Sequence, residues 1–197
     1  MKLIDEMFAM FDRYGDRHYG EDVTQREHML QSAWFARQDD APDSLVAAAL
    51  LHDIGQFLDE AGDAAETRGE DARHEESGFW FLRKHFPPDV VQPILLHVAA
   101  KRYLCAVEPG YLDTLSAASA LSLNLQGGPF SAEEAADFAA NPYAEAAVRL
   151  RRYDDLGKQR GLDVPPIEAY RPLLESQLDP SHGSDDAAHR DAISSRL

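Results

Sequence analysis

The chain has 197 residues, 44% hydrophobic and 27% charged, which is enough for one domain with a core of its own. Its formal net charge of −16 argues against binding to nucleic acids or anionic membranes, and no apolar run reaches the roughly 18 residues of a membrane span. The single cysteine, Cys105, excludes an internal disulfide framework. Because the N-terminus also lacks the basic start of a secretory signal, we expect a cytoplasmic protein.

The elements expected along the chain are all helices, because no run alternates with a period of two and β-branched residues are sparse. Residues 2–14 have helical apolar spacing, and Thr24 with Glu27 forms a T-x-x-E capping box that opens a helix to about residue 38. The stretch 45–54 is apolar all round, so we expect it to be the central buried helix, with Gly55 as its C-terminal cap. An acidic surface loop is expected at 59–71, and further helices at 72–85, 89–105, 111–125, 131–140, 143–157 and 167–178. We therefore predict one all-α domain over residues 1–178 and a polar, flexible tail at 179–197.

Four histidines recur on the expected helices at intervals of 24, 22 and 23 residues: His28, His52, His74 and His97. Antiparallel helices of a bundle can turn one residue each toward a common centre, which is how metal sites are built inside all-α folds. Asp53 follows His52 directly, and a carboxylate can bridge two metals, so the pair suits a two-metal centre of iron, manganese or zinc. Taken singly, a buried histidine is more often a hydrogen-bonded core residue than a metal ligand.

A cluster of cations is the second signal, since an acidic protein needs one to bind an anion. On a helix, Arg151, Asp154 and Lys158 share one face, and Lys101 lies one turn from His97. Such a run could be a solvated, salt-bridged stripe. Next to a metal centre it could instead supply one more ligand and several anion-binding groups.

Three serines form a hydroxyl stripe at helical spacing: Ser116, Ser119 and Ser122. Small residues at this spacing commonly allow helices to pack closely. If the stripe faces the site, Ser119 could donate a hydrogen bond to a phosphoryl oxygen.

These residues resemble the HD-domain superfamily in its two-metal form. The resemblance is closer to one branch, the mixed-valent diiron oxygenases of the PhnZ type, which cleave the carbon–phosphorus bond of 1-hydroxy-2-aminoethylphosphonates. It extends over residues 19–172. The segments that carry it are "GEDVTQREHMLQ", "LVAAALLHDIGQ", "HVAAKRYL", "LSAASALSLNLQGGP" and "RRYDDLGK".

The resemblance implies an HD-domain helical bundle with a buried dinuclear metal site that holds two iron ions, Fe(II) and Fe(III), and uses dioxygen as co-substrate. One iron would be held by His28, His52, Asp53 and Asp154, and the other by Asp53 as the bridge, His74 and His97. The phosphonate would bind Lys101, Ser119, Arg151 and Lys158. Glu21 and Gln25 would lie over the mouth of the site, near the amino end of the substrate.

Two positions depart from the family pattern, and both lie where the ends of the substrate are recognised. Gln56 stands where the family has a second histidine, and a neutral amide cannot act as an acid. Tyr19, the candidate gate that would cap the substrate-free iron, stands two residues before Glu21, one closer than in the family. A trimethylammonium head group would account for both changes, because aromatic faces and carboxylates hold such cations. The candidates for that contact are Tyr14, Tyr19, Glu21 and Asp22.

The reaction that the resemblance implies converts a small hydroxylated aminophosphonate, supplied by a separate hydroxylase, into glycine betaine or glycine plus phosphate. One alternative is an HD-type phosphohydrolase of a small phosphate ester, in which the metals activate water. A second alternative is an inositol-type ring oxygenase, but its neutral polyol substrate would leave Lys101, Arg151 and Lys158 without a function. A third is a non-catalytic helical binding module, whose structural metal would be fully coordinated by protein ligands.

Overall fold

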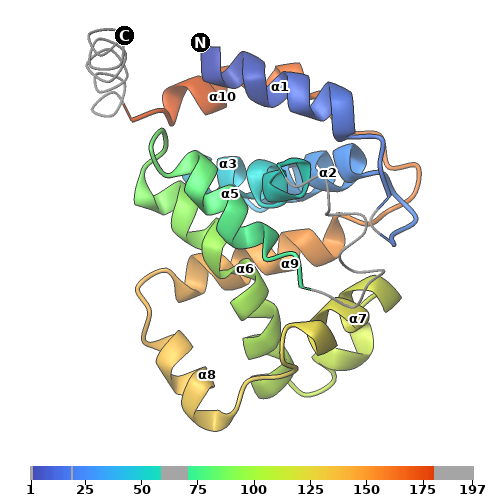
Figure 1. Cartoon of the computed structure of the whole chain (residues 1–197), viewed down its shortest axis with the longest axis vertical. Helices are drawn as coiled ribbons and strands as arrows, with labels where there is room; N and C mark the ends of the chain where they lie inside the picture. Colours follow the sequence, from blue (N-terminus) through green and yellow to red (C-terminus); the bar gives the residue numbers. More distant parts are fainter. Residues whose placement is uncertain (1, 19, 59–70, 180–197) are drawn as a thin grey trace, which may run out of the picture.

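The computed structural model describes residues 2–18, 20–58 and 71–179, and over these residues it contains helices and no strand (Figure 1). The α-helices are α1 (Lys2–Tyr14), α2 (Gln25–Gln38), α3 (Asp43–Leu51), α5 (His74–Leu82), α6 (Pro88–Val107), α7 (Ala117–Leu125), α8 (Ala132–Ala139), α9 (Ala144–Leu156) and α10 (Arg171–Ser176). Three short 3-10 helices join them: η1 (Ile54–Phe57), η2 (Tyr111–Thr114) and η3 (Ile167–Tyr170). The predicted all-α class is therefore confirmed. The acidic loop expected at 59–71 and the tail expected at 179–197 fall almost wholly outside the described residues.

Helix α6 is the axis of the bundle, since it packs against α9, α5, α3 and α8. By length and composition alone it could cross a membrane, but half of its apolar window is buried against the neighbouring helices. In Figure 1, α1 and α10 lie across one end of the molecule, while α7 and α8 lie at the other. The helices between these two ends, α2, α3, α5, α6 and α9, carry or adjoin the residues of the candidate metal centre.

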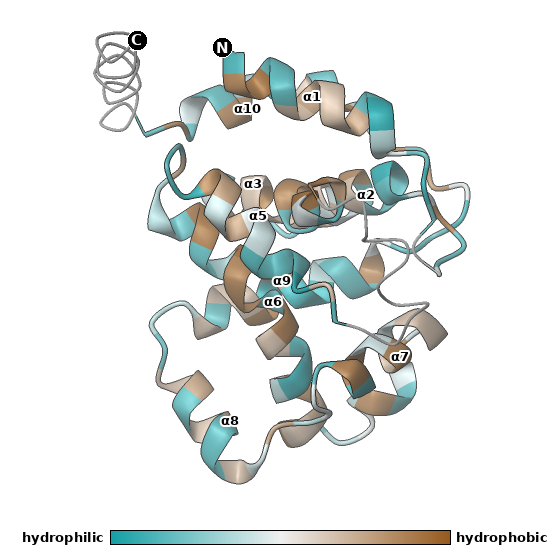
Figure 2. Ribbon diagram, viewed as in Figure 1, coloured by the Kyte–Doolittle hydropathy of each residue, from teal (hydrophilic) through white to brown (hydrophobic). Residues whose placement is uncertain are grey.

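Helix α3 is the most apolar element, and it is buried as expected. The residues from Ala47 to Leu51 have no exposed surface, and Figure 2 shows this helix as largely hydrophobic beside the more hydrophilic α9. Burying a leucine side chain stabilises the fold by about 1.5–3 kcal/mol. This anchoring holds the end of α3 in a fixed place, and His52 and Asp53 follow directly.

The end of α3 differs from the expectation, because the helix stops at Leu51 and not at Ile54. His52 and Asp53 lie in the turn between α3 and η1. Gly55 is therefore no helix cap. It lies where η1 crosses the start of α5, and a Cβ atom there would be 1.9 Å from the carbonyl oxygen of His74. The glycine is required because two backbones touch at this point.

Three further elements differ from the expected ones. The helix expected over 167–178 is divided into η3 and α10. The helix expected over 111–125 is broken into η2 and α7, because the Ser116 side chain caps α7 by accepting a hydrogen bond from the Ser119 N–H (3.1 Å). Helix α9 ends at Leu156, so Lys158 lies beyond the helix that was expected to carry it. The capping box of Thr24 and Glu27 forms as predicted.

Candidate metal centre and substrate cavity

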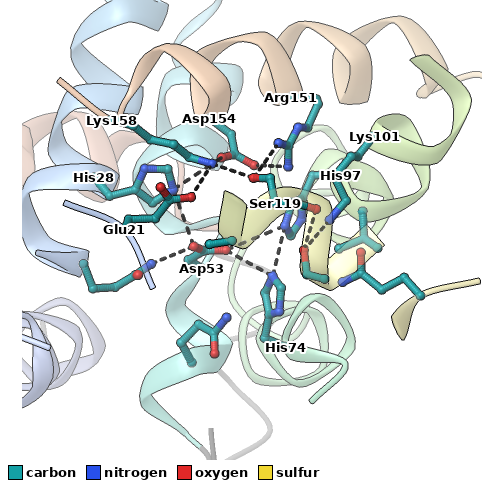
Figure 3. Close-up of a pocket in the computed structure, with 16 residues that line it drawn as sticks. Glu21, His28, Asp53, His74, His97, Lys101, Ser119, Arg151, Asp154 and Lys158 are labelled. Carbon is teal, nitrogen blue, oxygen red and sulfur yellow. Dashed lines mark hydrogen bonds and ion pairs between the residues drawn. The ribbon is translucent and has the colours of Figure 1, made fainter. Parts of the chain in front are cut away.

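Six predicted ligands come together as two adjacent groups of three donors in the middle of the bundle. Figure 3 labels His28, Asp53, His74, His97 and Asp154 among them. In each group the donor atoms all lie within 4.8 Å of one another. The first group is His28, His52 and Asp154, and the second is Asp53, His74 and His97. These residues come from α2, the turn after α3, the first position of α5, the middle of α6 and the end of α9.

Three of the four imidazole rings are oriented in the same way, with Nδ1 within hydrogen-bonding distance of a backbone carbonyl. The pairs are His28 with Gly157 (3.0 Å), His52 with Ala49 (2.9 Å) and His97 with Ile94 (2.7 Å). A carbonyl can only accept, so Nδ1 carries the proton in each of these rings and Nε2 presents a lone pair. The orientation thus directs an unprotonated nitrogen of each ring toward the centre.

The facing nitrogens provide the test of whether cations fit here. Nε2 of His28 lies 3.1 Å from Nε2 of His52, and Nε2 of His74 lies 3.1 Å from Nε2 of His97. In His28 and His52 both Nδ1 atoms carry the proton, so their Nε2 lone pairs face each other and repel, and a cation between them removes the repulsion. Imidazole and carboxylate donors suit iron, manganese or zinc. The residues therefore fit a pair of such ions.

Asp53 lies between the two groups. Its Oδ1 is 3.2 Å from Nε2 of His74 and 3.4 Å from Nε2 of His52, while its Oδ2 is 3.5 Å from Nε2 of His28. Burial opposes ionisation of this carboxyl, but the surrounding imidazoles outweigh it and hold the pKa of Asp53 well below its usual range. Asp53 is thus a carboxylate placed to serve both groups.

The imidazoles themselves respond in opposite directions. Burial opposes protonation of His74, but the Asp53 carboxylate outweighs it and raises the pKa of His74 to about 9. Burial and the neighbouring His74 lower the pKa of His97 to about 3. Burial also lowers the pKa of His28. Both rings are therefore neutral at ordinary pH, which is the form that binds metals.

A cavity of about 70 Å³ opens beside the donors, and one wall of it is cationic. This wall consists of Lys101, Arg151 and Lys158, with Ser119 between them. Nζ of Lys158 donates to Oγ of Ser119 (2.8 Å), and the Arg151 guanidinium lies 3.4 Å from the same oxygen. The structure thus brings together the four residues predicted to bind the phosphonate.

Lys101 is only 3% exposed, although it carries an ammonium group. Its Nζ donates to Oγ of Ser122 (2.7 Å), a serine that the sequence placed in the stripe without a role. Burial and the nearby Arg151 lower the pKa of Lys101 to about 8. A dianionic ligand would stabilise its charged form.

Arg151 is held by a network that the sequence did not reveal. Its Nε donates to the Tyr111 hydroxyl (3.1 Å), its other nitrogens pair with Asp154 (2.7 Å) and Asp155, and Tyr111 in turn donates to Asp155. Burial would lower the pKa of Arg151, but Asp154 and Asp155 raise it well above its usual value. The guanidinium is therefore fixed and charged. The only sequence feature that pointed to this network is that Asp155 directly follows Asp154, a predicted metal ligand.

Two residues predicted at the mouth, Glu21 and Gln25, also line the cavity. Glu21 accepts a hydrogen bond from Ser116 (2.6 Å) and pairs with Lys158 (3.0 Å), and Gln25 donates to Oδ2 of Asp53 (2.6 Å). Gln56, at the position of the family histidine, is buried and lines the same cavity. Ser116 thus acts on the site through Glu21, in addition to capping α7.

Two head-group candidates, Tyr14 and Asp22, are not brought into the cavity. Asp22 is exposed and does not line it. Tyr14 packs against Phe57, with ring centres 6.1 Å apart, and the guanidinium of Arg17 lies over its face. Tyr19 lies outside the described residues. Among the described lining residues there is no phenylalanine, tyrosine or tryptophan.

Comparison with known proteins adds the family. The HD domain family matches residues 21–113. The chain is 42% identical over 183 residues to the 1-hydroxy-2-(trimethylamino)ethylphosphonate dioxygenase (glycine-betaine-forming) of Leisingera caerulea, covering 92% of this chain and 93% of that one. It is 44% identical over 179 residues to the hydroxymethylphosphonate dioxygenase of Gimesia maris, covering 90% of this chain and 89% of that one. It is 31% identical over 181 residues to an uncharacterised protein of Acanthamoeba polyphaga mimivirus, covering 90% of this chain and 83% of that one. The chain therefore belongs to the HD-domain family, in the branch of the hydroxyphosphonate dioxygenases.

Proposed function

We propose that this protein is a dioxygenase that cleaves the carbon–phosphorus bond of a small 1-hydroxyalkylphosphonate and releases phosphate. The single observation that carries the proposal is the junction of two adjacent donor groups, with Asp53 between them, and a wall of three buried or half-buried cations. Two relatives at 42% and 44% identity, each matched over most of its length, are named as dioxygenases of hydroxyphosphonates.

We propose two iron ions, in the Fe(II)/Fe(III) state, as the resident metals. His28, His52, Asp53 and Asp154 would hold one ion, and Asp53, His74 and His97 the other. When bound, such a pair supplies the redox chemistry by which dioxygen reacts with the substrate. The donor chemistry supports this proposal, since neutral imidazoles and carboxylates are preferred ligands of iron.

The other residues of the site bind and orient the substrate. The phosphonate takes the place beside Lys101, Arg151 and Lys158, whose positive charges attract its two negative charges. The Ser119 hydroxyl donates to one of its oxygens. The cations adjoin the metal donors, since Asp154 pairs with both Arg151 (2.7 Å) and Lys158 (3.6 Å) (Figure 3). A phosphonate bound to the cations therefore lies beside the metal positions, with its hydroxyl-bearing carbon toward them. Such positioning accounts for a large part of the rate in many enzymes.

For the other end of the substrate we propose a cationic head group, trimethylammonium or primary ammonium, so that the carbon product is glycine betaine or glycine. Glu21 places a carboxylate at the mouth of the cavity, and one relative is named for a trimethylamino substrate. The other relative is named for hydroxymethylphosphonate, which has no head group. The test of the proposal therefore compares substrates with and without a cationic head group.

The second candidate function is hydrolysis of a small phosphate ester by the same metals and cations. The observation that favours it is the cationic wall, because it would bind a phosphate as well as a phosphonate. A requirement for dioxygen separates the two reactions.

The test is phosphate release from the iron-loaded, partly reduced protein, with and without dioxygen. Three substrates are compared: 1-hydroxy-2-(trimethylammonio)ethylphosphonate, 2-amino-1-hydroxyethylphosphonate and hydroxymethylphosphonate. Phosphate that appears only with dioxygen supports the proposed reaction, and the preferred substrate identifies the head group. Phosphate release from simple esters without dioxygen, and none from the three phosphonates, would replace the proposal with the hydrolase.

The hydroxyl group of the substrate implies an earlier step in which a separate hydroxylase acts on the parent phosphonate. We place both steps in the cytoplasm, because a single half-buried cysteine and a dianionic small substrate suit that compartment.

A further inference from the structure

His74 differs from the other three histidines in what its outer nitrogen faces. The Nδ1 atoms of His28, His52 and His97 each lie within 3.0 Å of a backbone carbonyl. Nδ1 of His74 faces a carboxylate instead, with Oε2 of Glu75 at 3.9 Å. His74 is also the first residue of α5, so it has no preceding turn of its own helix to supply a carbonyl.

Glu75 is a buried acid with one carboxylate oxygen that makes no hydrogen bond to the described part of the chain. It is 9% exposed, and its Oε2 has no hydrogen-bond partner among the described residues. A buried acceptor that is left unpaired costs about 1–3 kcal/mol, and more if it is charged. Such a cost is typical of a group that is kept for function. The neighbouring Glu76 is more exposed and pairs with Arg73, as an ordinary surface acid does.

The surroundings of Glu75 leave it room to move. It borders a chamber of about 200 Å³ together with Asp71, Arg73, Arg102 and Gln126, and the last of these also lines the substrate cavity. Closing the gap to Nδ1 of His74 from 3.9 Å to hydrogen-bonding distance, about 2.8–3.0 Å, needs a shift of about 1 Å.

We propose that Glu75 is the positioning residue of His74: its carboxylate accepts the Nδ1–H of His74 and thereby directs Nε2 of that ring at the metal held by Asp53, His74 and His97. This inference rests on the proposed metal centre. A carboxylate in this position makes the imidazole a more basic ligand, whereas a backbone carbonyl orients the ring with less charge. The two metal positions are thus made unequal by one residue that is not itself a ligand.

The experiment measures metal binding, not turnover. The metal-free protein is titrated with zinc(II), which is redox-inert, and unfolded with urea in parallel. The variants are Glu75→Leu, which removes the acceptor at similar volume, Glu75→Gln, which keeps an acceptor oxygen without the charge, and Glu76→Gln as the matched control. We expect Glu75→Leu to weaken one of the two zinc sites by about 10–100-fold. Glu75→Gln should have a smaller effect, and Glu76→Gln none.

The stability of the metal-free protein separates positioning from support of the fold. An unpaired buried carboxylate is unfavourable there, so Glu75→Leu should be as stable as the parent chain or more stable. In a His74→Ala background, Glu75→Leu should change zinc affinity no further, because both substitutions act on the same ligand. The proposal is overturned if both zinc affinities stay unchanged, or if the metal-free protein loses stability and both sites weaken together. A parent chain that binds two zinc ions but releases no phosphate would refute the proposed function alone.

Discussion

Substituting Gly55 by alanine tests how the backbone of the H-D turn positions His74. A Cβ atom at Gly55 would lie 1.9 Å from the carbonyl oxygen of His74 and 2.8 Å from the backbone nitrogen of Gly78. To reach an ordinary contact of 3.4 Å, η1 and the start of α5 must separate by about 1.5 Å. His74 lies on α5 and Asp53 directly before η1, so the same movement separates Nε2 of His74 from Oδ1 of Asp53, now 3.2 Å apart.

The cost follows from the atoms that collide. Overpacking a core by one methyl group costs about 1–3 kcal/mol, and here both partners are backbone that cannot rotate away, so we expect about 3 kcal/mol. With a urea dependence of about 2 kcal/mol per molar, the unfolding midpoint of the metal-free protein should fall by about 1.5 M. The zinc site that contains His74 should weaken as well.

Gly78→Ala is the control at the same contact. A Cβ atom there would meet Gly55 and Ile54 at 3.4–3.8 Å, which is ordinary packing. Because Gly78 lies inside α5, alanine should even stabilise the helix by about 0.5–1 kcal/mol. If Gly55→Ala unfolds at the same urea concentration as the parent chain and binds both ions, the two backbones are not in the contact described here.

Three further outcomes are expected at the site itself. Asp53→Ala should remove both irons and the dioxygen-dependent phosphate release, since Asp53 contacts both donor groups; iron analysis that finds both ions retained would contradict its bridging role. The affinity for the phosphonate should fall as the pH rises through about 8, where Lys101 loses its charge, and Lys101→Arg should abolish this limb of the KM–pH profile; a limb that persists in the variant belongs to another group. Asp155→Asn should raise KM about tenfold while kcat changes less, because the substitution removes a charged partner that holds Arg151 in place. A fall in kcat as large as the rise in KM would contradict a role in binding alone.

The helices and the six donors could be predicted because local signals encode them. The capping box of Thr24 and Glu27, the apolar run of α3 and the spacing of the histidines all lie within short stretches of sequence. The family resemblance then supplied which residues meet, and the chain does belong to that family.

What escaped the sequence depends on contacts between distant segments or on small breaks in helices. Tyr111 reaches Arg151, 40 residues away, because the chain breaks between η2 and α7. Glu75 resembles any acidic residue in the first turn of a helix, and only its burial beside His74 distinguishes it. The end of α3 at Leu51 could not be predicted, because the close approach of Gly55 to α5 is a tertiary contact that overrides the helical pattern.

The carbonyls that orient His52 and His97 each belong to the residue three positions earlier in the same chain segment. The direction of these rings is therefore established as soon as their own helices form, before any ion arrives. Loading the metals becomes a late step of maturation that needs no refolding of these two ligands. Ions of similar preference would meet the same standing set of donors, so metal availability acts beside ligand type and geometry in selecting the ion.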